Sequence, residues 1–295
     1  MKLYFVGLVV FLAIVPPVIA AEVKPSGPES QVSPVRPISG EGPKRIVSIN
    51  LCTDELLLQL VGRERVAALT KFSTDPEVST VAVGAQGIWQ TQGDIEHVLA
   101  CGPDMVLGGR FSNKETVRFF KRSGIPVQVF KVPKSFEAIY ADIRRLAEAV
   151  GEKDKGEAIV RRMQEELAGL KKTSTPRRAV FFQSDNYVPG SGTFENAVME
   201  AAGLRNVAVE LGIKDYGRMG LEELIRAKPD VIIFSSEQKK ARTVRGEVLN
   251  HPAIKKALPG VKTVTIPTLY LNCGSPASVE AVRILVKETS TGIRY

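Results

Sequence analysis

The longest helical periodicity in the chain lies between Ser135 and Lys172, where apolar residues recur every three or four positions. Ser135 is the expected N-cap, and Glu137 falls in the first turn, where the helix dipole favours an acidic side chain. No strand or tight turn is signalled inside this stretch, despite a polar break at residues 151–156. We therefore predict one long helix over residues 134–172. Its apolar face would consist of Ile139, Ile143, Leu146, Val150, Ile159, Met163, Leu167 and Leu170.

Two stretches that resemble each other flank this helix. Residues 95–107 and 221–233 each combine a short amphipathic helix, a Pro-Asp pair and a buried-type strand. One such match means little, because this unit is common in parallel sheets, but further strands correspond in the same order. The pattern therefore predicts an α/β protein of two pseudo-symmetric lobes with central parallel sheets, joined by the long helix, with a ligand cleft between them. The additional strand pairs are 45–50 with 178–183 and 125–130 with 261–266.

The first 20 residues have the composition of a secretory signal peptide. Lys2 precedes an apolar core, Leu3–Val15, that is too short to span a bilayer comfortably. We expect cleavage near Ala20 and export, with no insertion into the membrane afterwards. An uncleaved anchor is the alternative, although Pro16-Pro17 breaks the apolar run. No cysteine lies near the cleavage site, so no lipoprotein signal is expected.

The rest of the chain divides by composition into four parts. Residues 21–43 are rich in Pro, Ser, Gly and charged residues, and we expect them to form a disordered tether. We place the N-terminal α/β lobe at 44–133, the linking helix at 134–172 and the C-terminal α/β lobe at 173–295.

The overall composition is that of a soluble globular protein, with 44% apolar and 24% charged residues. A net charge of +8 could indicate nucleic acid or an anionic membrane as a partner. Lys and Arg are scattered, however, and no aromatic residues are interleaved with them, so we expect no nucleic-acid partner. The cysteines, Cys52, Cys101 and Cys273, match no zinc motif, and an odd number leaves at least one thiol unpaired or intermolecular.

Segments that follow the predicted strands carry weaker signals. Asn50–Asp54 is expected to form a turn, followed by a helix over residues 55–61 that Thr53 or Asp54 would cap. The other segments expected to lack regular structure are 80–94, 187–193, 215–220 and 237–246, the last being a surface loop or the start of a helix.

Loops at the carboxyl ends of parallel strands collect at one edge of a sheet, where α/β proteins bind ligands. In this chain those loops concentrate aromatic and arginine side chains. Aromatic faces and arginines suit an organic ligand that carries anionic groups and has its metal already chelated. The candidate ligand-binding residues are Asn50, Cys52, Trp89, Arg110, Phe111, Tyr187, Ser191, Tyr216, Arg218, Tyr270 and Asn272.

Other chemistry is weakly supported. Both histidines, His97 and His251, lie outside the predicted cleft, which leaves few ways to build a bare-metal site or a histidine-dependent nucleophile. We therefore expect no catalytic residues, no cofactor and no metal held directly by side chains. A cell-envelope enzyme stays as an alternative, because Asp54, Asp94 and Asp215 could serve as paired carboxylates.

Taken in order, these motifs resemble the periplasmic substrate-binding proteins of ABC importers, in the class that handles iron–siderophore complexes, haem and cobalamin. The resemblance covers residues 44–288 and implies a carrier that delivers a metal chelate to the dimeric permease of an ABC transporter. It also implies two lobes bridged by one long helix. The residues that carry it are Arg45–Leu57, the two helix–Pro-Asp–strand units, Pro189–Thr193 and Gly274–Pro276.

The resemblance assigns roles to several residues. Glu96 and Glu222, the second residues of the two repeat units, correspond to the glutamates that engage permease arginines in this family, although stabilisation by the helix dipole would also explain them. Trp89 falls near the family's cleft aromatic residue. Cys52 and Cys273, on cleft loops of opposite lobes, could form a disulfide across the mouth of the cleft or remain separate thiols.

The ligands of the class can be ranked by charge. We place an iron–siderophore complex first, because Arg110 and Arg218 suit an anionic ligand, with cobalamin second and haem third. A scaffold or signalling receptor on the same fold is a further alternative.

Overall fold

The computed structural model describes residues 42–236 and 251–290. The predicted signal peptide (1–20), the predicted tether apart from its last two residues, and residues 237–246 lie outside the described residues. No helix in the described ranges is both long enough and apolar enough to span a membrane.

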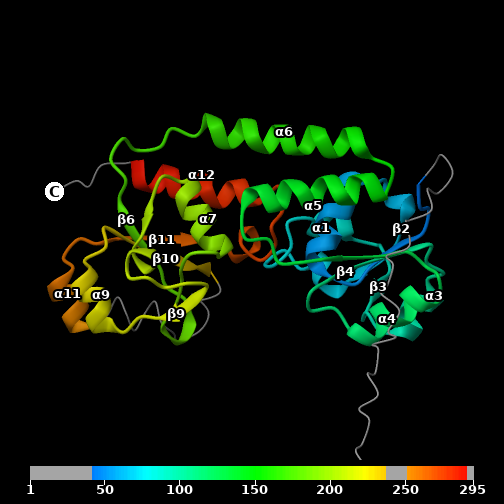
Figure 1. Ribbon diagram of the computed structural model, residues 1–295, viewed down its shortest axis with the longest axis horizontal. Coiled ribbons are helices and arrows are strands. Elements are labelled where there is room, and N and C mark those ends of the chain that lie inside the picture. Colours follow the sequence, from blue (N-terminus) through cyan, green and yellow to red (C-terminus); the bar gives the residue numbers. More distant parts are fainter. Residues whose placement is uncertain (1–41, 237–250, 291–295) are drawn as a thin grey trace, which may run out of the picture. The chain divides into compact units, whose positions relative to one another are not determined.

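The N-terminal lobe is built on a five-stranded parallel sheet with the strand order β3-β2-β1-β4-β5 (Figure 1). Its central strands are buried on both faces, as their nearly continuous apolar runs predict. The strands are β1 (Ile46–Ser48), β2 (Val66–Thr70), β3 (Gln90–Thr91), β4 (Met105–Gly109) and β5 (Val127–Phe130). The helices are α1 (Leu51–Leu60), α2 (Ala82–Ala85), α3 (Ile95–Ala100) and α4 (Lys114–Arg122), with 3-10 turns η1 (Arg63–Arg65) and η2 (Lys71–Thr74).

The C-terminal lobe has a parallel sheet with the strand order β11-β10-β6-β8 and a separate antiparallel ribbon of β7 and β9. The sheet strands are β6 (Arg178–Phe181), β8 (Arg205–Asn206), β10 (Val231–Ser235) and β11 (Lys262–Ile266), and the ribbon strands are β7 (Tyr187–Pro189) and β9 (Tyr216–Arg218). The helices are α7 (Phe194–Ala201), α8 (Val207–Glu210), α9 (Leu221–Ala227), α11 (Pro252–Ala257) and α12 (Ser278–Ser290), with 3-10 turns η3 (Ser184–Asn186) and η5 (Thr268–Tyr270).

The two sheets have the same internal order, which confirms the predicted pseudo-symmetry. Strand β1 lies between β2 and β4, and β6 lies between β8 and β10. The strands that end each half, β5 and β11, pair with β4 and β10 respectively. The correspondence that the sequence pattern predicted for three strands therefore extends to a fourth pair, β2 and β8.

The prediction of one uninterrupted linking helix is wrong. Residues 134–172 form two helices, α5 (Phe136–Ala149) and α6 (Lys153–Gly169), which turn back on each other at Gly151, whose φ is +77°. They lie antiparallel (Figure 1), with Arg144 bonded to Glu157 at 2.8 Å. Gly156 permits this approach, because a Cβ there would stand 2.4 Å from the Cβ of Ala147. The break therefore contains a turn residue and a packing glycine, and both α5 and α6 keep the apolar faces that the sequence predicted.

Helix α6 links the hairpin to the second lobe. Its Glu166 pairs with Arg283 of α12 at 2.9 Å. The largest apolar cluster of the protein is continuous between the lobes, and the Phe136 ring of α5 stands 5.6 Å from the Phe194 ring of α7. The lobes thus share a core on the side where α5, α6, α7 and α12 pack.

Three local predictions also differ from the structure. Helix α1 begins at Leu51, because the side chain of Asn50 rather than Thr53 or Asp54 caps it by accepting from Cys52 N at 3.1 Å. Residues 80–94 contain the short α2 and β3. The segments 187–193 and 215–220 are not independent loops, because they contain the paired strands β7 and β9.

Candidate ligand-binding site

A cavity of about 460 Å³ opens at the carboxyl edge of the N-terminal sheet. Its lining comes from segments that follow four strands: β1, β2, β3 and β4. This is the edge at which parallel α/β sheets bind ligands. The lining residues are Ile49, Asn50, Leu51, Thr70, Lys71, Phe72, Thr91, Gln92, Phe111 and Ser112.

Hydrogen bonds hold the rim of this cavity in place. Ser112 Oγ donates to the carbonyl of Ile49 at 3.0 Å and accepts from Gly109 N at 2.9 Å, which ties the loop after β4 to the end of β1. Asn50 lies against Gly109, where a Cβ would stand 2.6 Å from the Asn50 amide. Only glycine lets these two loops approach so closely.

Two aromatic rings at the cavity are open to solvent. Phe111 is 81% exposed and Phe72 is 52% exposed. Each ring has a cation beside it, with Arg110 at 5.8 Å from the Phe111 centroid and Lys71 Nζ at 5.4 Å from the Phe72 centroid. The cavity thus presents apolar faces together with positive charge.

The C-terminal lobe presents a similar combination on its β7–β9 ribbon. Tyr187 and Arg218 are paired in register, and the guanidinium stands 5.0 Å from the Tyr187 ring centroid. Tyr216 donates its hydroxyl proton to Glu195, with an O–O distance of 3.0 Å. Burial raises the pKa of Tyr216, and the nearby Glu195 carboxylate raises it further. The Tyr216 side chain is therefore a neutral phenol with its proton engaged.

Close backbone contact supports the ribbon. Gly190 lies against the carbonyl of Ile213, where an added Cβ would stand 2.1 Å from the oxygen. Ser191 forms an isolated bridge with Lys214. Asp215, at the start of the ribbon's second strand, has a φ of +50° and pairs with Lys134 at 2.6 Å, which lowers the pKa of its carboxyl group.

The two lobes meet beside the cavity. The structure bonds Cys52, in the first turn of α1, to Cys273, with the Cα atoms 5.1 Å apart. The next residue, Gly274, packs against the ring of Pro133, where a Cβ would stand 2.1 Å from the Pro133 Cγ. Cys273 is buried, so the bond lies inside the lobe junction and not across an open mouth. Of the two alternatives for Cys52 and Cys273, the structure has the disulfide.

Two acidic residues of α1 are buried next to this junction. Asp54 accepts from Thr70 N at 3.1 Å and from Thr70 Oγ1 at 2.5 Å, and burial raises its pKa to about 7. Glu55 accepts from Thr80 N at 2.9 Å. Burial raises the pKa of Glu55 as well, while the hydroxyls of Ser275 and Thr80 act in the opposite direction. Ser275 belongs to the other lobe, so Glu55 lies at the lobe contact.

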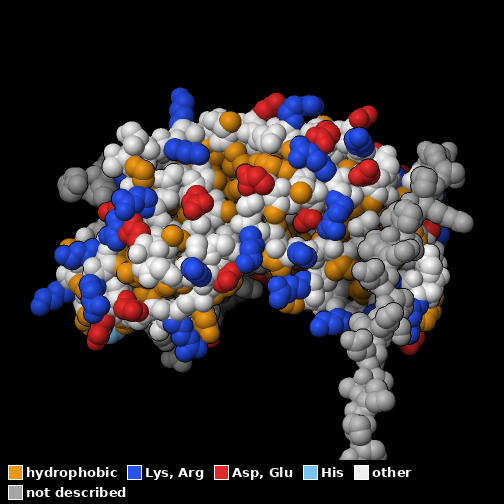
Figure 2. Space-filling view, in the orientation of Figure 1, with side chains coloured by type: hydrophobic (Ala, Val, Ile, Leu, Met, Phe, Trp, Pro, Cys, Tyr) orange, Lys and Arg blue, Asp and Glu red, His pale blue; other side chains and the backbone are white. Residues whose placement is uncertain are grey.

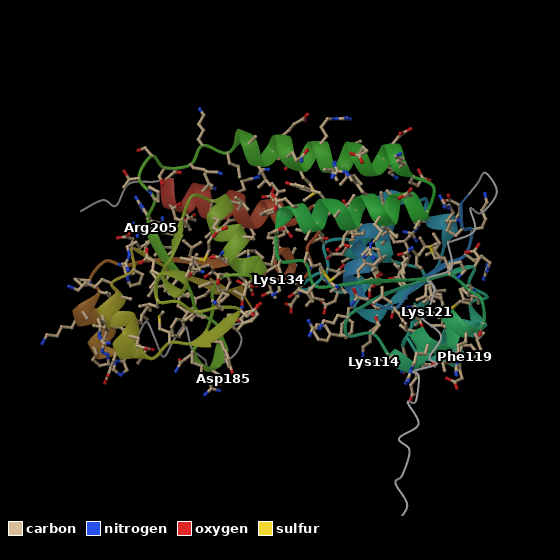
Figure 3. The ribbon with its side chains drawn as sticks, viewed as in Figure 1. Lys114, Phe119, Lys121, Lys134, Asp185 and Arg205 are labelled. Atoms are coloured by element: carbon tan, nitrogen blue, oxygen red, sulfur yellow. A yellow bond between two sulfur atoms is a disulfide. The ribbon has the colours of Figure 1, made fainter. Side chains whose placement is uncertain are left out.

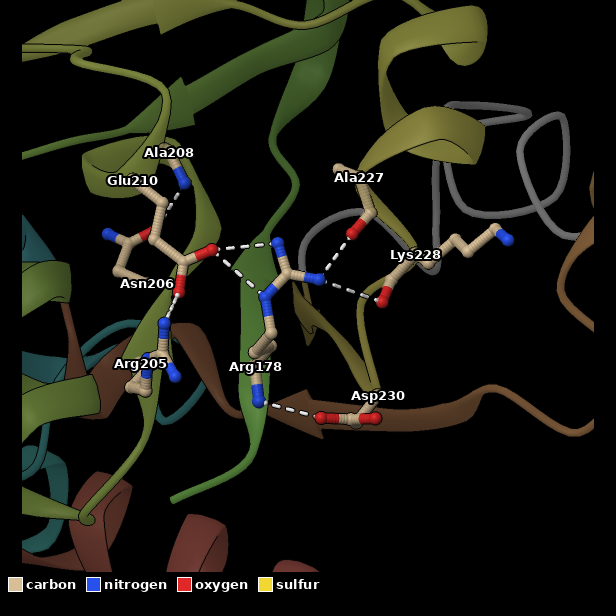
Figure 4. Close-up of polar contacts among 8 residues, drawn as sticks. All are labelled: Arg178, Arg205, Asn206, Ala208, Glu210, Ala227, Lys228 and Asp230. Atoms are coloured by element: carbon tan, nitrogen blue, oxygen red, sulfur yellow. Dashed lines mark hydrogen bonds and ion pairs between the residues drawn. The ribbon is translucent and has the colours of Figure 1, made fainter.

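Helices α3 and α9, which carry Glu96 and Glu222, have equivalent anchors. Arg178 donates to the carbonyls of Ala227 and Lys228 at the end of α9, and its backbone N–H donates to Asp230 at 2.8 Å (Figure 4). Arg178 also bonds Glu210 at 2.7 Å. The guanidinium thereby supplies donors to carbonyls that a helix end leaves without partners.

The N-terminal lobe repeats this arrangement. Arg45 donates to the carbonyls of Cys101 and Gly102 at the end of α3, and its N–H donates to Asp104 at 3.0 Å. Gly102 and Lys228 occupy equivalent positions, and both have positive φ, of +55° and +47°. The repeated Pro-Asp pair is thus part of a clamp that fixes each helix to the first strand of its sheet.

Comparison with known proteins supports a common origin for this architecture. The sequence profile of one family, described as periplasmic binding protein, matches residues 46–268. The chain belongs to the periplasmic binding protein family.

Individual relatives agree with that assignment. The cobalamin-binding protein of Halobacterium salinarum is 22% identical over 247 residues, covering 81% of this chain and 67% of the relative. The apo structure of a periplasmic haem-binding protein from Roseiflexus has a TM-score of 0.68 at 23% identity, covering 84% of this chain and 99% of that one. A structure from an Fe3+-hydroxamate transport system of Saccharomonospora viridis has a TM-score of 0.64 at 19% identity, covering 85% and 94%. The first two are named as binding proteins and the third as part of a transport system, and the family to which the chain belongs is one of binding proteins and not of enzymes.

The predicted site residues of this binding protein separate into two groups. Asn50 and Phe111 line the cavity, with Arg110 and Cys52 next to them in sequence, and Tyr187, Ser191, Tyr216 and Arg218 lie together on or beside the ribbon. Trp89 does not line the cavity: it is 65% exposed and precedes the edge strand β3. Tyr270 packs against the apolar core, and Asn272 reaches the carbonyl of Val78 at 3.5 Å across the lobe junction.

The sequence reasoning missed Lys71, Phe72 and Gln92, which line the same cavity. Lys71 and Phe72 directly follow β2, so the rule that ligands bind at the carboxyl ends of strands would have found them. Gln92 follows the two-residue β3, which the sequence pattern did not reveal.

The three carboxylates considered for catalysis do not converge. Asp54 bonds Thr70, Asp94 caps α3 and bonds His97, and Asp215 pairs with Lys134. In the described part of the chain, no three His, Cys, Asp or Glu side chains lie together as a metal site would require.

Proposed function

We propose that this protein is the solute-binding component of an ABC importer and captures a metal chelate between its lobes. The observation that carries the proposal is the cavity at the N-terminal sheet edge, where Phe72 and Phe111 remain exposed. Exposed aromatic rings that gather at a cavity mark a binding site. The Tyr187–Arg218 pair would form the opposite wall, since the two lobes are joined next to the cavity by Cys52–Cys273.

The chemistry of this site favours a chelate whose metal is already fully coordinated. Haem iron takes an axial side chain such as His, Cys, Met or Tyr. Tyr216 is a poor candidate for that role, because its proton is held by Glu195, so Tyr187 is the tyrosine of the site that would have to coordinate haem iron. A ferric siderophore or cobalamin makes no such demand on the protein.

Charge favours the siderophore among these two. Lys71, Arg110 and Arg218 each stand beside an aromatic ring of the proposed site. A ferric siderophore with anionic oxygen donors would bring negative charge to these cations and an organic surface to the rings. Cobalamin is the second candidate, supported by the cobalamin-binding relative, and haem is the third, supported by the haem-binding structural relatives.

Delivery would use one glutamate from each lobe. Glu96 and Glu222 are exposed in the first turns of α3 and α9, on equivalent elements of the two lobes. We propose that they engage arginines of a permease dimer, and that residues 1–20 direct export and are removed near Ala20.

A ligand panel tests the binding proposal. The mature chain, residues 21–295, would be titrated with ferric siderophores, cobalamin, haem and free metal ions while thermal unfolding is followed. A ligand at 100 times its dissociation constant adds about 2.7 kcal/mol to the free energy of unfolding, which raises Tm by several degrees. We expect a rise with one ferric siderophore and none with bare ions. A rise with haem or cobalamin alone would overturn the ranking, and no rise with any chelate would overturn the proposal.

Single substitutions locate the site. Phe111→Ala and Arg218→Met should each weaken binding of that ligand by about tenfold, because each removes an aromatic or cationic contact. Arg205→Met, an exposed arginine of the same lobe outside the proposed site, is the matched control and should leave affinity unchanged. Equal affinities in all three variants would mean that the ligand binds elsewhere.

A transport assay tests delivery separately. The double variant Glu96→Arg/Glu222→Arg should abolish uptake while ligand affinity is retained. Glu137→Arg/Glu165→Arg makes the same change of charge on exposed residues of α5 and α6 and should transport normally. Loss of affinity in the first variant would show that these glutamates are not docking residues.

A further inference from the structure

A second cavity, of about 580 Å³, lies between α4 and the start of α3. It shares no lining residue with the proposed ligand cavity. Three of its lining side chains are cationic and one is acidic, and two are apolar. These residues are Ile95, Glu115, Arg118, Phe119, Lys121 and Arg122. We call this cavity the α4 groove.

The α4 groove has a firm base. Phe120 is fully buried in the core of the N-terminal lobe, and the Phe119 ring meets it edge-on at 5.2 Å. Asn113 caps α4 by accepting from Glu115 N at 2.9 Å. The cations therefore lie on a helix whose position is fixed by packing and by its cap. Helix α4 lies at the edge of the lobe away from α5 and α6 (Figure 3).

The cations of α4 form no ion pair among the residues that the structure describes, although Glu115 of the same helix also lines the groove. These cations are Lys114, Arg118, Lys121 and Arg122. Two arginines of other helices are paired, Arg144 with Glu157 and Arg283 with Glu166. The helix dipole accounts for Lys121 and Arg122 in the last turn, but it disfavours Lys114 in the first. The cations of the groove are therefore available to acidic groups of a partner.

The α4 groove also adjoins a proposed docking residue. Ile95, which lines it, is the residue before Glu96, and Asp94 caps the same helix by accepting from His97 N at 2.9 Å. The groove therefore begins at the first turn of α3, the turn that carries Glu96. The surface next to Glu96 would present acidic and basic groups side by side.

We propose that the α4 groove is a second docking contact, which receives carboxylates on the permease subunit that binds Glu96. This inference rests on the proposed function. The partner would then carry a cation for Glu96 and acidic side chains for Arg118, Lys121 and Arg122. Such a pairing of opposite charges fixes the register of docking and accelerates encounter at low salt. Phe119 and Ile95 give the partner segment an apolar floor.

The test is a binding measurement between this protein and the permease dimer that imports its chelate, reconstituted in nanodiscs. The variant Arg118→Glu/Lys121→Glu/Arg122→Glu should raise the dissociation constant by about tenfold or more at low salt, mainly by slowing association. The matched control makes the same change of charge on α6 and just beyond it: Lys155→Glu/Arg161→Glu/Lys171→Glu. This control should change the dissociation constant by less than about twofold. Thermal unfolding and chelate affinity should be the same in both variants.

The outcomes separate this proposal from the proposed function. If the wild type binds the permease and the α4 variant binds as the α6 control does, only the α4 proposal fails. If the wild type does not bind, or binds equally after Glu96→Arg/Glu222→Arg, the delivery proposal itself fails and this one fails with it. Phosphatidylglycerol vesicles provide another arm. The wild type could bind these vesicles while the α4 variant loses vesicle binding and keeps its affinity for the permease. That result would assign the cations to a lipid surface and overturn the proposal.

Discussion

At the scale of single residues, the acids of α1 are the least expected feature. Asp54 and Glu55 are adjacent in sequence and fully buried, and each has one carboxylate oxygen without a hydrogen-bond partner within the described structure. Burial of a charged carboxylate is costly, so the protonated form is favoured in the folded state. The pKa of Asp54, raised to about 7, places its titration within the physiological range.

Asp54 should make stability depend on pH. Because its folded pKa is about 7 and its model value is 3.8, the folded state holds an extra proton between these values, and the free energy of unfolding falls as pH rises through this window. The loss is on the order of 4 kcal/mol. Asp54→Asn removes the titration, so the variant should gain stability relative to the wild type between pH 4 and pH 8 in urea unfolding. The control Asp154→Asn, at an exposed position, should show the same pH dependence of the free energy of unfolding as the wild type. If Asp54→Asn also runs parallel to the wild type, the titration does not belong to Asp54.

Single site residues were predictable where the strand-end rule applies. Asn50 and Phe111 follow β1 and β4, and both line the cavity. Trp89 does not line this cavity, because β3 is only two residues long and begins directly after it, so the tryptophan precedes the strand instead of following it. The burial of Asp54 and Glu55 gave no sequence signal, since acidic residues near a helix start are ordinarily exposed and stabilised by the dipole.

At the scale of elements, the clamp explains why the helix–Pro-Asp–strand unit occurs twice. In both lobes an arginine at the start of the first strand bonds the carbonyls at the end of a helix, and the aspartate of the unit accepts the strand's N–H. Strand, helix and turn are thereby fixed together. The orientation of Glu96 and Glu222 follows from this contact at the opposite ends of their short helices.

The clamp can be tested against a control that shares its acidic partner. Arg178→Gln should lower the free energy of unfolding by about 1–3 kcal/mol, because it leaves the α9 carbonyls without donors. Arg205 also pairs with Glu210, at 2.7 Å, but its side chain is 60% exposed against 34% for Arg178. Arg205→Gln should therefore cost at most about 1 kcal/mol. Urea unfolding measures both; equal losses would mean that only the ion pair with Glu210 matters.

Element boundaries were predictable where capping signals were strong. Ser135 caps α5 as expected, accepting from Ala138 N at 3.2 Å. The hairpin between α5 and α6 was missed because its apolar face has the same period on both sides of the break. Gly151 and Gly156 carried the information, since one takes positive φ and the other admits Ala147.

At the scale of the whole molecule, the two-lobed architecture was predictable because order carries more information than any single motif. Three strands in matching positions around one linker implied a repeat, and the sheet orders confirm it. The sequence did not decide between a disulfide and two separate thiols, because pairing of the cysteines depends on the distance between the lobes. No local sequence pattern encodes that distance. On the face shown in Figure 2, Lys and Arg side chains are interspersed with Asp and Glu, as their scatter along the sequence suggested.

The disulfide should contribute measurably to stability. Cys52→Ser/Cys273→Ser should lower the free energy of unfolding by about 2–4 kcal/mol, because the bond closes a loop that spans both lobes. The corresponding fall in Tm is roughly 5–10 °C. A thiol reductant should lower the Tm of the wild type and leave that of the double variant unchanged. If the reductant leaves the wild-type Tm unchanged, the disulfide adds nothing to the stability of the folded state.

The lobes are tied covalently at two places, the chain that follows α6 and the bond between Cys52 and Cys273. A rigid body fixed at one point can turn about three axes, whereas a body fixed at two points can turn only about the line that joins them. These two ties alone would leave the lobes one axis of relative rotation, and the apolar core that the lobes share resists motion about it. One coordinate, such as the separation of Phe111 and Tyr216, would describe how far the binding site is open. Reduction of the bond would remove one of the two covalent ties and leave the shared core as the restraint on twisting.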